Sequence, residues 1–223
     1  MKKSTFLLLL LALGATKAFA TPVTLTFTGL QSYEPINTFY DGGTGGDGSV
    51  FSGPNYGIVF GSDSLAIISD QEGGGGNFSN VPPPGTNTIA FFLSGPGDVM
   101  DVAAGFTTGF SFYYAAATYP GSVSVYSGLD GTGTLLDTLN LAVNGSGCDS
   151  SGYTFDCWTE AGVAFGGSAE SVVFGGSANQ IGFADITLGA SSVPSNTPEP
   201  SSIFLLGSGA LGLAGMVRRK LKV

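Results

Sequence analysis

The side chains able to do chemistry in the body of this chain are carboxylates. The sequence has 223 residues, with 16 Asp and Glu, seven Lys and Arg, no His, and a formal net charge of −9. The span from Thr21 to Val217 contains all 16 acids and no basic residue. His-based catalytic triads, His-ligated metals and Arg or Lys phosphate clamps are therefore excluded, which removes most hydrolases, kinases and nucleotide-binding enzymes. A nucleic-acid partner is excluded as well, because neutralising phosphates requires Lys and Arg.

Paired carboxylates are the remaining enzymatic option. A retaining glycosidase needs two acids about 5–5.5 Å apart. The 16 acids offer many pairs, and no spacing in the sequence singles one out. Because the span also lacks His for proton transfer and Arg or Lys to hold a substrate, we expect a protein that is not an enzyme and assign no catalytic residue.

Calcium is the cofactor that this composition best permits, since it needs carboxylate and carbonyl oxygens but no His or Cys. The segment from Asp41 to Asp47 contains one copy of the Gly-Gly-x-Gly-x-Asp calcium repeat. That repeat binds calcium when copies stack on one another, and only a single copy is present. The alternative is a glycine-rich surface loop.

Cys148 and Cys157 are the only cysteines. In an exported chain, two cysteines at this spacing predict one disulfide that closes a ten-residue loop, worth roughly 2–3 kcal/mol by chain-entropy reasoning. Tyr153, Phe155 and the only Trp, Trp158, lie beside the predicted bond. They could form an exposed aromatic platform, but we expect at least two of the three to pack into the core or under the loop.

Residues 21–188 are predicted to form one all-β domain, because apolar and polar residues alternate in short runs bounded by Gly, Pro, Asn or Asp. No segment of this domain has a convincing helical period. The number of short strands favours a two-sheet antiparallel sandwich that is jelly-roll-like. The predicted strands begin at Val23 and continue with 56–60, 65–68, 88–93, 99–106, 110–114, 122–125, 134–141, 162–165, 171–174 and 180–188.

The last predicted strand has a break in its alternation. Ile181 and Phe183 are at odd-numbered positions, whereas Ile186 and Leu188 are at even-numbered ones. Because alternate residues of a strand face opposite sides, we expect a β-bulge near Asp185. The segment 181–188 resembles the last strand of galactose-binding-like and carbohydrate-binding jelly rolls. That resemblance implies a structural calcium held by Asp185 and by an acid near the first strands, which here is Glu34, with Asp41 as the substitute. The alternative is a solvated Asp on an edge strand.

The N-terminal residues 1–20 are predicted to be a cleaved signal peptide. Lys2 and Lys3 precede an apolar run, and Ala18 and Ala20 provide the small residues that signal peptidase requires before its cut. The apolar run is too short to span a bilayer. The mature chain is therefore expected to begin at Thr21.

The C-terminal region divides into a tether and a membrane signal. Residues 189–197 are small, polar and proline-bearing, as expected of an extended linker. Residues 198–223 begin with Pro198, Glu199 and Pro200, continue with an uncharged apolar stretch, and end near Arg218, Arg219 and Lys220. A short transmembrane helix with its basic end in the cytoplasm would hold the exported body at the inner membrane transiently.

These last residues resemble the PEP-CTERM sorting signal in all three of its parts, in the same order. The resemblance implies recognition by an exosortase, a membrane protease thought to cleave near Pro-Glu-Pro and to release or transfer the product. Proteins with this signal are secreted by Gram-negative bacteria that make extracellular polysaccharide. The resemblance implies a sorting route to the cell surface or the medium and leaves the role of the domain open.

Three functions remain compatible with the sequence. The leading hypothesis is a non-enzymatic component of the cell envelope or extracellular matrix, associated with polysaccharide. The second is a carbohydrate-binding module that uses Tyr113, Tyr126 and Trp158 to stack on sugar. The third is a glycosidase that uses two of the acids.

Overall fold

A computed structural model describes residues 21–46, 51–82, 87–148 and 152–194. Within these ranges the chain forms nine strands and one short 3₁₀ helix, η1 (Asp70–Glu72), and contains no helix long and apolar enough to cross a membrane. The predicted signal peptide, Asp47 and the predicted sorting signal lie outside the described residues. The strands are β1 (Val23–Leu25), β2 (Ile58–Phe60), β3 (Ser64–Ile68), β4 (Thr88–Phe92), β5 (Gly97–Ala115), β6 (Gly121–Tyr126), β7 (Leu135–Leu141), β8 (Thr159–Gly176) and β9 (Gly182–Leu188).

The prediction of an all-β antiparallel sandwich is confirmed, with two differences in the strands. The runs predicted at 99–106 and 110–114 are parts of the single strand β5, and those at 162–165 and 171–174 are parts of β8. Glycines introduce irregularities without ending the strands: Gly105, inside the run predicted at 99–106, has a φ of 70°, and Gly167, between the two runs of β8, has a φ of 89°. A residue without a Cβ can adopt these angles inside a paired strand, so the strand bends and continues.

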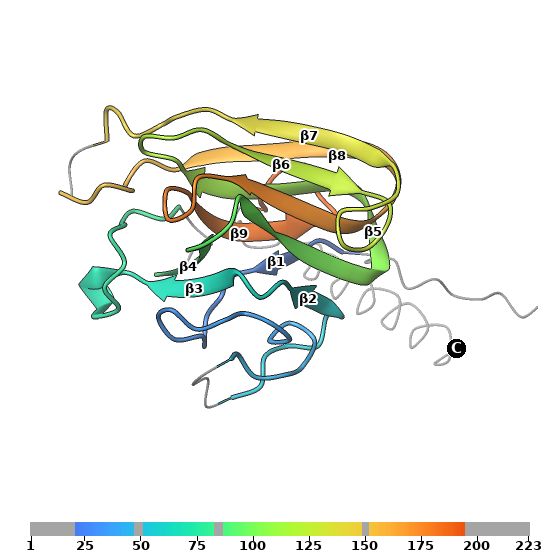
Figure 1. Ribbon diagram of the computed structural model, residues 1–223, viewed down its shortest axis with the longest axis horizontal. Helices are drawn as coiled ribbons and strands as arrows, with labels where there is room; N and C mark the ends of the chain where they lie inside the picture. Colours follow the sequence, from blue (N-terminus) through green and yellow to red (C-terminus); the bar gives the residue numbers. More distant parts are fainter. Residues whose placement is uncertain (1–20, 47–50, 83–86, 149–151, 195–223) are drawn as a thin grey trace, which may run out of the picture.

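The two long strands join the layers of the sandwich. The first half of β5 pairs with β2 and the second half of β8, whereas its second half pairs with β9 and the first half of β8. Register shifts separate the two halves of β5 around Phe106. The hydrogen-bonded order is β3-β4-β9-β5-β8-β6-β7, with β1 on β9 and β2 on β5. Figure 1 shows β6, β7 and β8 on one side of the molecule and β1, β2 and β3 on the other.

The main core lies between the layers and is rich in aromatic rings. Phe112, Phe174 and Phe183 pack edge to face, with ring centroids 4.9–6.4 Å apart. All three side chains are buried. Each such pair adds about 0.5–1.5 kcal/mol beyond the burial of its area. The core therefore holds β5, β8 and β9 in fixed positions.

The layer of β3, β4 and β9 is apolar on both faces. Ala66, Ala90 and Phe183 face the main core, whereas their neighbours Ile67, Ile89 and Ala184 belong to a second cluster on the opposite face. Every residue of β4 and β9 is buried. The second cluster is completed by side chains from two loops, Phe78 from one and Phe155 and Trp158 from the other. We call these two loops, residues 73–82 and 152–158, the roof.

The residues that follow β9 continue along the sheet. The Gly189 amide donates to the Gly109 carbonyl (3.0 Å), and the Val193 amide donates to Oε1 of Glu160 (2.7 Å). The side chain of Val193 is buried. The first residues of the segment that the sequence assigns to the linker therefore pack on β5 and β8, and the rest of that segment, from Ser195 on, lies outside the described residues.

Candidate functional site

A pocket of about 180 Å³ opens between the roof and the outer face of β3, β4 and β9. Ile67, Ile89 and Phe91 form its apolar floor, and the roof contributes Phe78 and Phe155. Each floor residue comes from the strand face that points away from the main core. The pocket therefore exists because the alternation of β3 and β4 exposes a second apolar surface, which the roof covers only in part.

Three polar residues line the pocket beside the aromatic rings, and one of them, Asn77, is hydrogen-bonded to Thr154. The other two are Tyr33 and Asn179. Tyr33 is 51% exposed, and its ring packs edge to face on Phe91 with centroids 6.1 Å apart. Asn179 lies in the turn between β8 and β9. Among the residues that the structure describes, neither the Tyr33 hydroxyl nor the Asn179 side-chain amide has a hydrogen-bond partner. Both groups are available to a ligand.

The backbone of Tyr33 is strained. Its φ of 64° is a left-handed value that a bulky side chain rarely adopts, and its amide is held by the Ala66 carbonyl at 2.7 Å. Conformations of this kind persist where the surrounding structure enforces them, and they concentrate at binding sites. The strain here places an aromatic ring with a free hydroxyl at the pocket.

The three aromatic residues that the sequence analysis proposed as sugar contacts do not line this pocket. Trp158 is half-buried, donates its indole Nε1–H to the Ser79 carbonyl (2.7 Å), and packs edge to face on Phe78. Tyr113 is half-buried against the same cluster, and Tyr126 lies at the end of β6, away from the pocket. A sugar contact by any of these three stays a prediction. The expectation that at least two of Tyr153, Phe155 and Trp158 pack inward is confirmed.

The predicted bulge near Asp185 is confirmed. The register between β5 and β9 shifts between Ser111 and Tyr113, opposite Asp185, which has a φ of 51°. Asp185 is 1% exposed, and neither of its carboxylate oxygens has a hydrogen-bond partner among the described residues. Burial raises the pKa of Asp185 from 3.8 to about 7. An unpaired buried carboxylate is costly, so the group must take up a proton or a cation.

The other predicted calcium ligands differ in their surroundings. Glu34 is buried, and its Oε2 accepts the Gln31 amide at 2.7 Å; Asp41 is exposed on a loop. No group of three or more His, Cys, Asp or Glu residues able to hold a metal occurs within the described ranges. The unpaired oxygens of Asp185 are of the type that calcium takes as ligands. Calcium at Asp185 remains a proposal.

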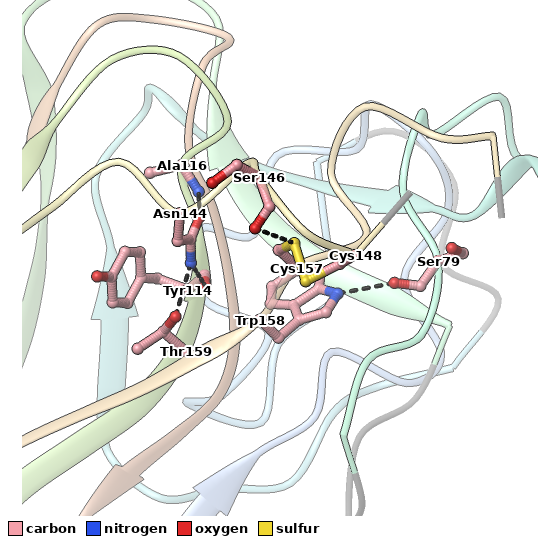
Figure 2. The surroundings of a disulfide bond; sticks show 9 residues. All are labelled: Ser79, Tyr114, Ala116, Asn144, Ser146, Cys148, Cys157, Trp158 and Thr159. Atoms are coloured by element: carbon pink, nitrogen blue, oxygen red, sulfur yellow. Dashed lines mark hydrogen bonds between the residues drawn. A yellow bond between two sulfur atoms is a disulfide. The ribbon is translucent and has the colours of Figure 1, made fainter. Parts of the chain in front are cut away.

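The predicted disulfide between Cys148 and Cys157 is confirmed, with the two Cα atoms 5.3 Å apart. It ties the roof residue Cys157 to the segment that follows β7 (Figure 2). Asn144, four residues before Cys148, is fixed on the end of β5: its Oδ1 accepts the Ala116 amide (2.8 Å), and its Nδ2 donates to the Tyr114 carbonyl (3.1 Å).

Comparison with known proteins identifies the C-terminal segment. Residues 196–220 match the PEP-CTERM protein-sorting motif. The chain carries an exosortase sorting signal. This signal indicates export in a Gram-negative bacterium, as the sequence predicted. The matched residues lie outside the part of the chain that the structure describes.

Several solved structures with partial likeness are carbohydrate-binding modules. One is a CBM6 module from Clostridium stercorarium in complex with cellobiose (TM-score 0.38, 14% identity, 59% of this chain and 85% of that one). Another is a module of Cellvibrio mixtus lichenase 5A with cellotriose (0.35, 14%, 57% and 87%). A further match is an adhesin domain of Lys-gingipain from Porphyromonas gingivalis (0.32, 14%, 58% and 93%). At such low identities and TM-scores, their ligands are not transferred to this chain. No curated protein matches the sequence.

Of the residues that line the pocket, sequence reasoning named only Phe155 as a possible binding residue. The lining residues come from separate segments, around Tyr33, Gly75, Ile89, Phe155 and Asn179. One signal was present: residues 88–93 are apolar at every position after the initial Thr. Such a run is typical of a strand buried on both faces, which implies that another layer covers it. Nothing in the sequence identifies the segments that supply that layer.

Proposed function

We propose that this protein is a non-enzymatic, exported β-sandwich that binds a neutral glycan in the pocket beneath the roof. The observation that carries the proposal is the combination of aromatic walls with the free hydroxyl of Tyr33 and the free amide of Asn179. Binding sites for small ligands are typically apolar and aromatic concavities with a few placed polar groups. A sugar ring offers both surfaces, C–H groups on its faces and hydroxyls on its edge.

Charge supports a neutral ligand over an anionic one. The described body of the chain contains no Lys, Arg or His, while acids are distributed along it. Uronate, sulfate and phosphate groups are bound by Arg and Lys through charge-assisted hydrogen bonds, and a uniformly acidic surface repels them. Polysaccharides built from neutral hexoses or pentoses therefore fit this protein best.

The composition of the pocket favours binding over hydrolysis. None of the residues that line it is Asp or Glu. A glycosidase needs two carboxyl groups on either side of the scissile bond. A ligand held here would be bound without being cut, as in a lectin or a component of an extracellular matrix.

The sorting signal supports a location where such a ligand is present. We propose that signal peptidase cleaves after Ala20 and that the C-terminal segment holds the protein in the inner membrane until an exosortase processes it near Pro198–Pro200. The folded domain would then reach the cell surface or the extracellular polysaccharide.

The proposal is tested by replacing Tyr33 in the secreted protein. We expect saturable binding to neutral oligosaccharides on a glycan array, and Tyr33→Ala should weaken it by about tenfold or more in calorimetry, because an exposed aromatic anchor is removed. Tyr33→Phe, which loses only the hydroxyl, should have a smaller effect. The matched control is Tyr119→Ala, since Tyr119 is 49% exposed and does not line the pocket. Equal losses in the Tyr33→Ala and Tyr119→Ala variants, or a preference for anionic glycans, would argue against the proposal.

A further inference from the structure

The two loops of the roof are joined to each other by their backbones. Phe78 and Phe155 form a parallel bridge outside the named strands. The Phe155 amide donates to the Asn77 carbonyl (3.2 Å), and the Ser79 amide donates to the Phe155 carbonyl (3.3 Å). The bridge joins segments 77 positions apart, and both of its phenylalanines line the pocket.

Side chains reinforce this bridge on both sides. Asn77 accepts the Thr154 amide at its Oδ1 (3.2 Å) and donates from its Nδ2 to the Thr154 hydroxyl (2.8 Å). On the other side, Trp158 donates to the Ser79 carbonyl (2.7 Å). The two roof loops therefore hold each other in place, and displacing one removes the partners of the other.

The roof is fastened to the sandwich through the disulfide. Asn144 binds β5 through the Ala116 amide and the Tyr114 carbonyl, and it binds β8 through the Thr159 hydroxyl (2.9 Å). Cys148 follows four residues later and is bonded to Cys157, which lies between Phe155 and Trp158. Figure 2 shows this series of contacts, from the Asn144 hydrogen bonds through the sulfur atoms to the Trp158–Ser79 hydrogen bond.

We propose that the Cys148–Cys157 disulfide sets the shape of the pocket, so that the glycan binding proposed above is confined to the oxidised protein. Cysteines remain thiols in a reducing cytoplasm and form disulfides after export. The protein would therefore gain its affinity only on the outer side of the inner membrane. The inference rests on the proposed function for its ligand and on the described contacts for its mechanism.

The chemistry is a reversible two-electron exchange. A dithiol reductant such as dithiothreitol transfers two electrons and two protons to the sulfur–sulfur bond, which leaves Cys148 and Cys157 as thiols and the reagent as a cyclic disulfide. After reduction, Phe155 loses its covalent connection to the segment after β7 and is held only by the roof hydrogen bonds and by packing in the second cluster. Its ring and that of Phe78 must then be ordered by the ligand, which lowers affinity.

The experiment compares the oxidised protein, the same protein in dithiothreitol, and the double variant Cys148→Ser/Cys157→Ser. Calorimetry with a panel of neutral tetrasaccharides should show that the reduced protein and the double variant both bind about tenfold or more weakly than the oxidised protein. Far-ultraviolet circular dichroism should remain unchanged, and re-oxidation of the reduced protein should restore binding. Equal affinity before and after reduction, with the sandwich intact, overturns the inference.

A second measurement needs no ligand and separates the two proposals. Reduction should accelerate hydrogen exchange of the Phe155 and Ser79 amides by about tenfold or more, because opening the roof exposes both. The amides of β5 and β8, away from the roof, should exchange as before. Unchanged exchange at Phe155 and Ser79 overturns the inference even if a glycan binds. Accelerated exchange in a protein that binds no neutral glycan refutes the proposed function and leaves the disulfide as the element that orders the pocket.

Discussion

In EDTA, the wild-type protein should become less stable as the pH rises from about 4 to about 7, and replacing Asp185 by Asn should remove this decline. The isosteric amide keeps the volume of the side chain and cannot ionise. The measurement is a series of urea unfolding curves for both proteins across this pH range. We expect the difference in their free energies of unfolding to shift in favour of Asp185→Asn with increasing pH and to level off above about 7.

The sign follows from the direction of the shift. The pKa of Asp185 is 3.8 in its unperturbed state and is raised to about 7 by burial in the folded protein. Between these values the folded protein retains a proton that the unfolded chain has released, so each increase in pH favours unfolding. Asp98 and Asp101 also have pKa values raised by burial, but both are present in the two proteins, and the comparison cancels them.

The same pair of proteins tests the proposed calcium site. Calcium bound by the Asp185 oxygens would keep the carboxylate charged, raise the melting temperature of the wild-type protein at pH 8, and have little effect on Asp185→Asn. An identical wild-type melting curve in calcium and in EDTA would eliminate the calcium proposal. Parallel pH profiles of the two proteins would instead show that Asp185 does not retain its proton on folding.

Placing a methyl group on Gly162 should destabilise the protein by about 1–3 kcal/mol. A Cβ at this position would lie 2.1 Å from the Ser191 carbonyl oxygen and 2.9 Å from the Ser111 Cβ. The clash is with the backbone that packs on β5 and β8 after β9, and it cannot be relieved by rotating a side chain. Urea unfolding of Gly162→Ala, with an unchanged m-value, measures the effect.

The matched control lies on the same strand. A Cβ on Gly166 would have nothing within 4 Å, so Gly166→Ala should leave stability unchanged or slightly raised. If both variants were equally stable, the segment from Gly189 to Val193 would not be held against the sheet. A loss confined to Gly162→Ala would show that the folded domain extends beyond β9 to the residues around Ser191.

The strands could be predicted because local alternation decides which face of a strand is buried. The slip in parity between Phe183 and Ile186 also predicted the bulge at Asp185, since a bulge inserts one residue into one strand only. The fusion of predicted strands into β5 and β8 could not be predicted. Gly109 and Gly167 lie between the predicted runs and indicate strand breaks, and only pairing with distant strands shows that β5 and β8 continue through them.

The pocket could not be predicted for a related reason. Its roof depends on contacts such as that between Asn77 and Thr154. These residues are far apart in the sequence, so no local pattern predicts their contact. Trp158, the single Trp, was proposed to stack on sugar, yet its indole packs on Phe78 and donates a hydrogen bond to the Ser79 carbonyl. The exposed aromatic group at the pocket is Tyr33, which is held there by a left-handed backbone conformation. Nothing in the sequence predicts that conformation for a Tyr.

The central claim is that a neutral glycan occupies the pocket beneath the roof. The most direct test is a nuclear magnetic resonance titration of the isotope-labelled, oxidised protein with the neutral oligosaccharide that binds best on the array. The amide signals of Tyr33, Gly75, Asn179 and Gly182 should shift and saturate together, while those of β6, including Tyr126, remain in place. Saturable shifts that gather on β6, or the absence of any saturable shift across the panel, would contradict the claim.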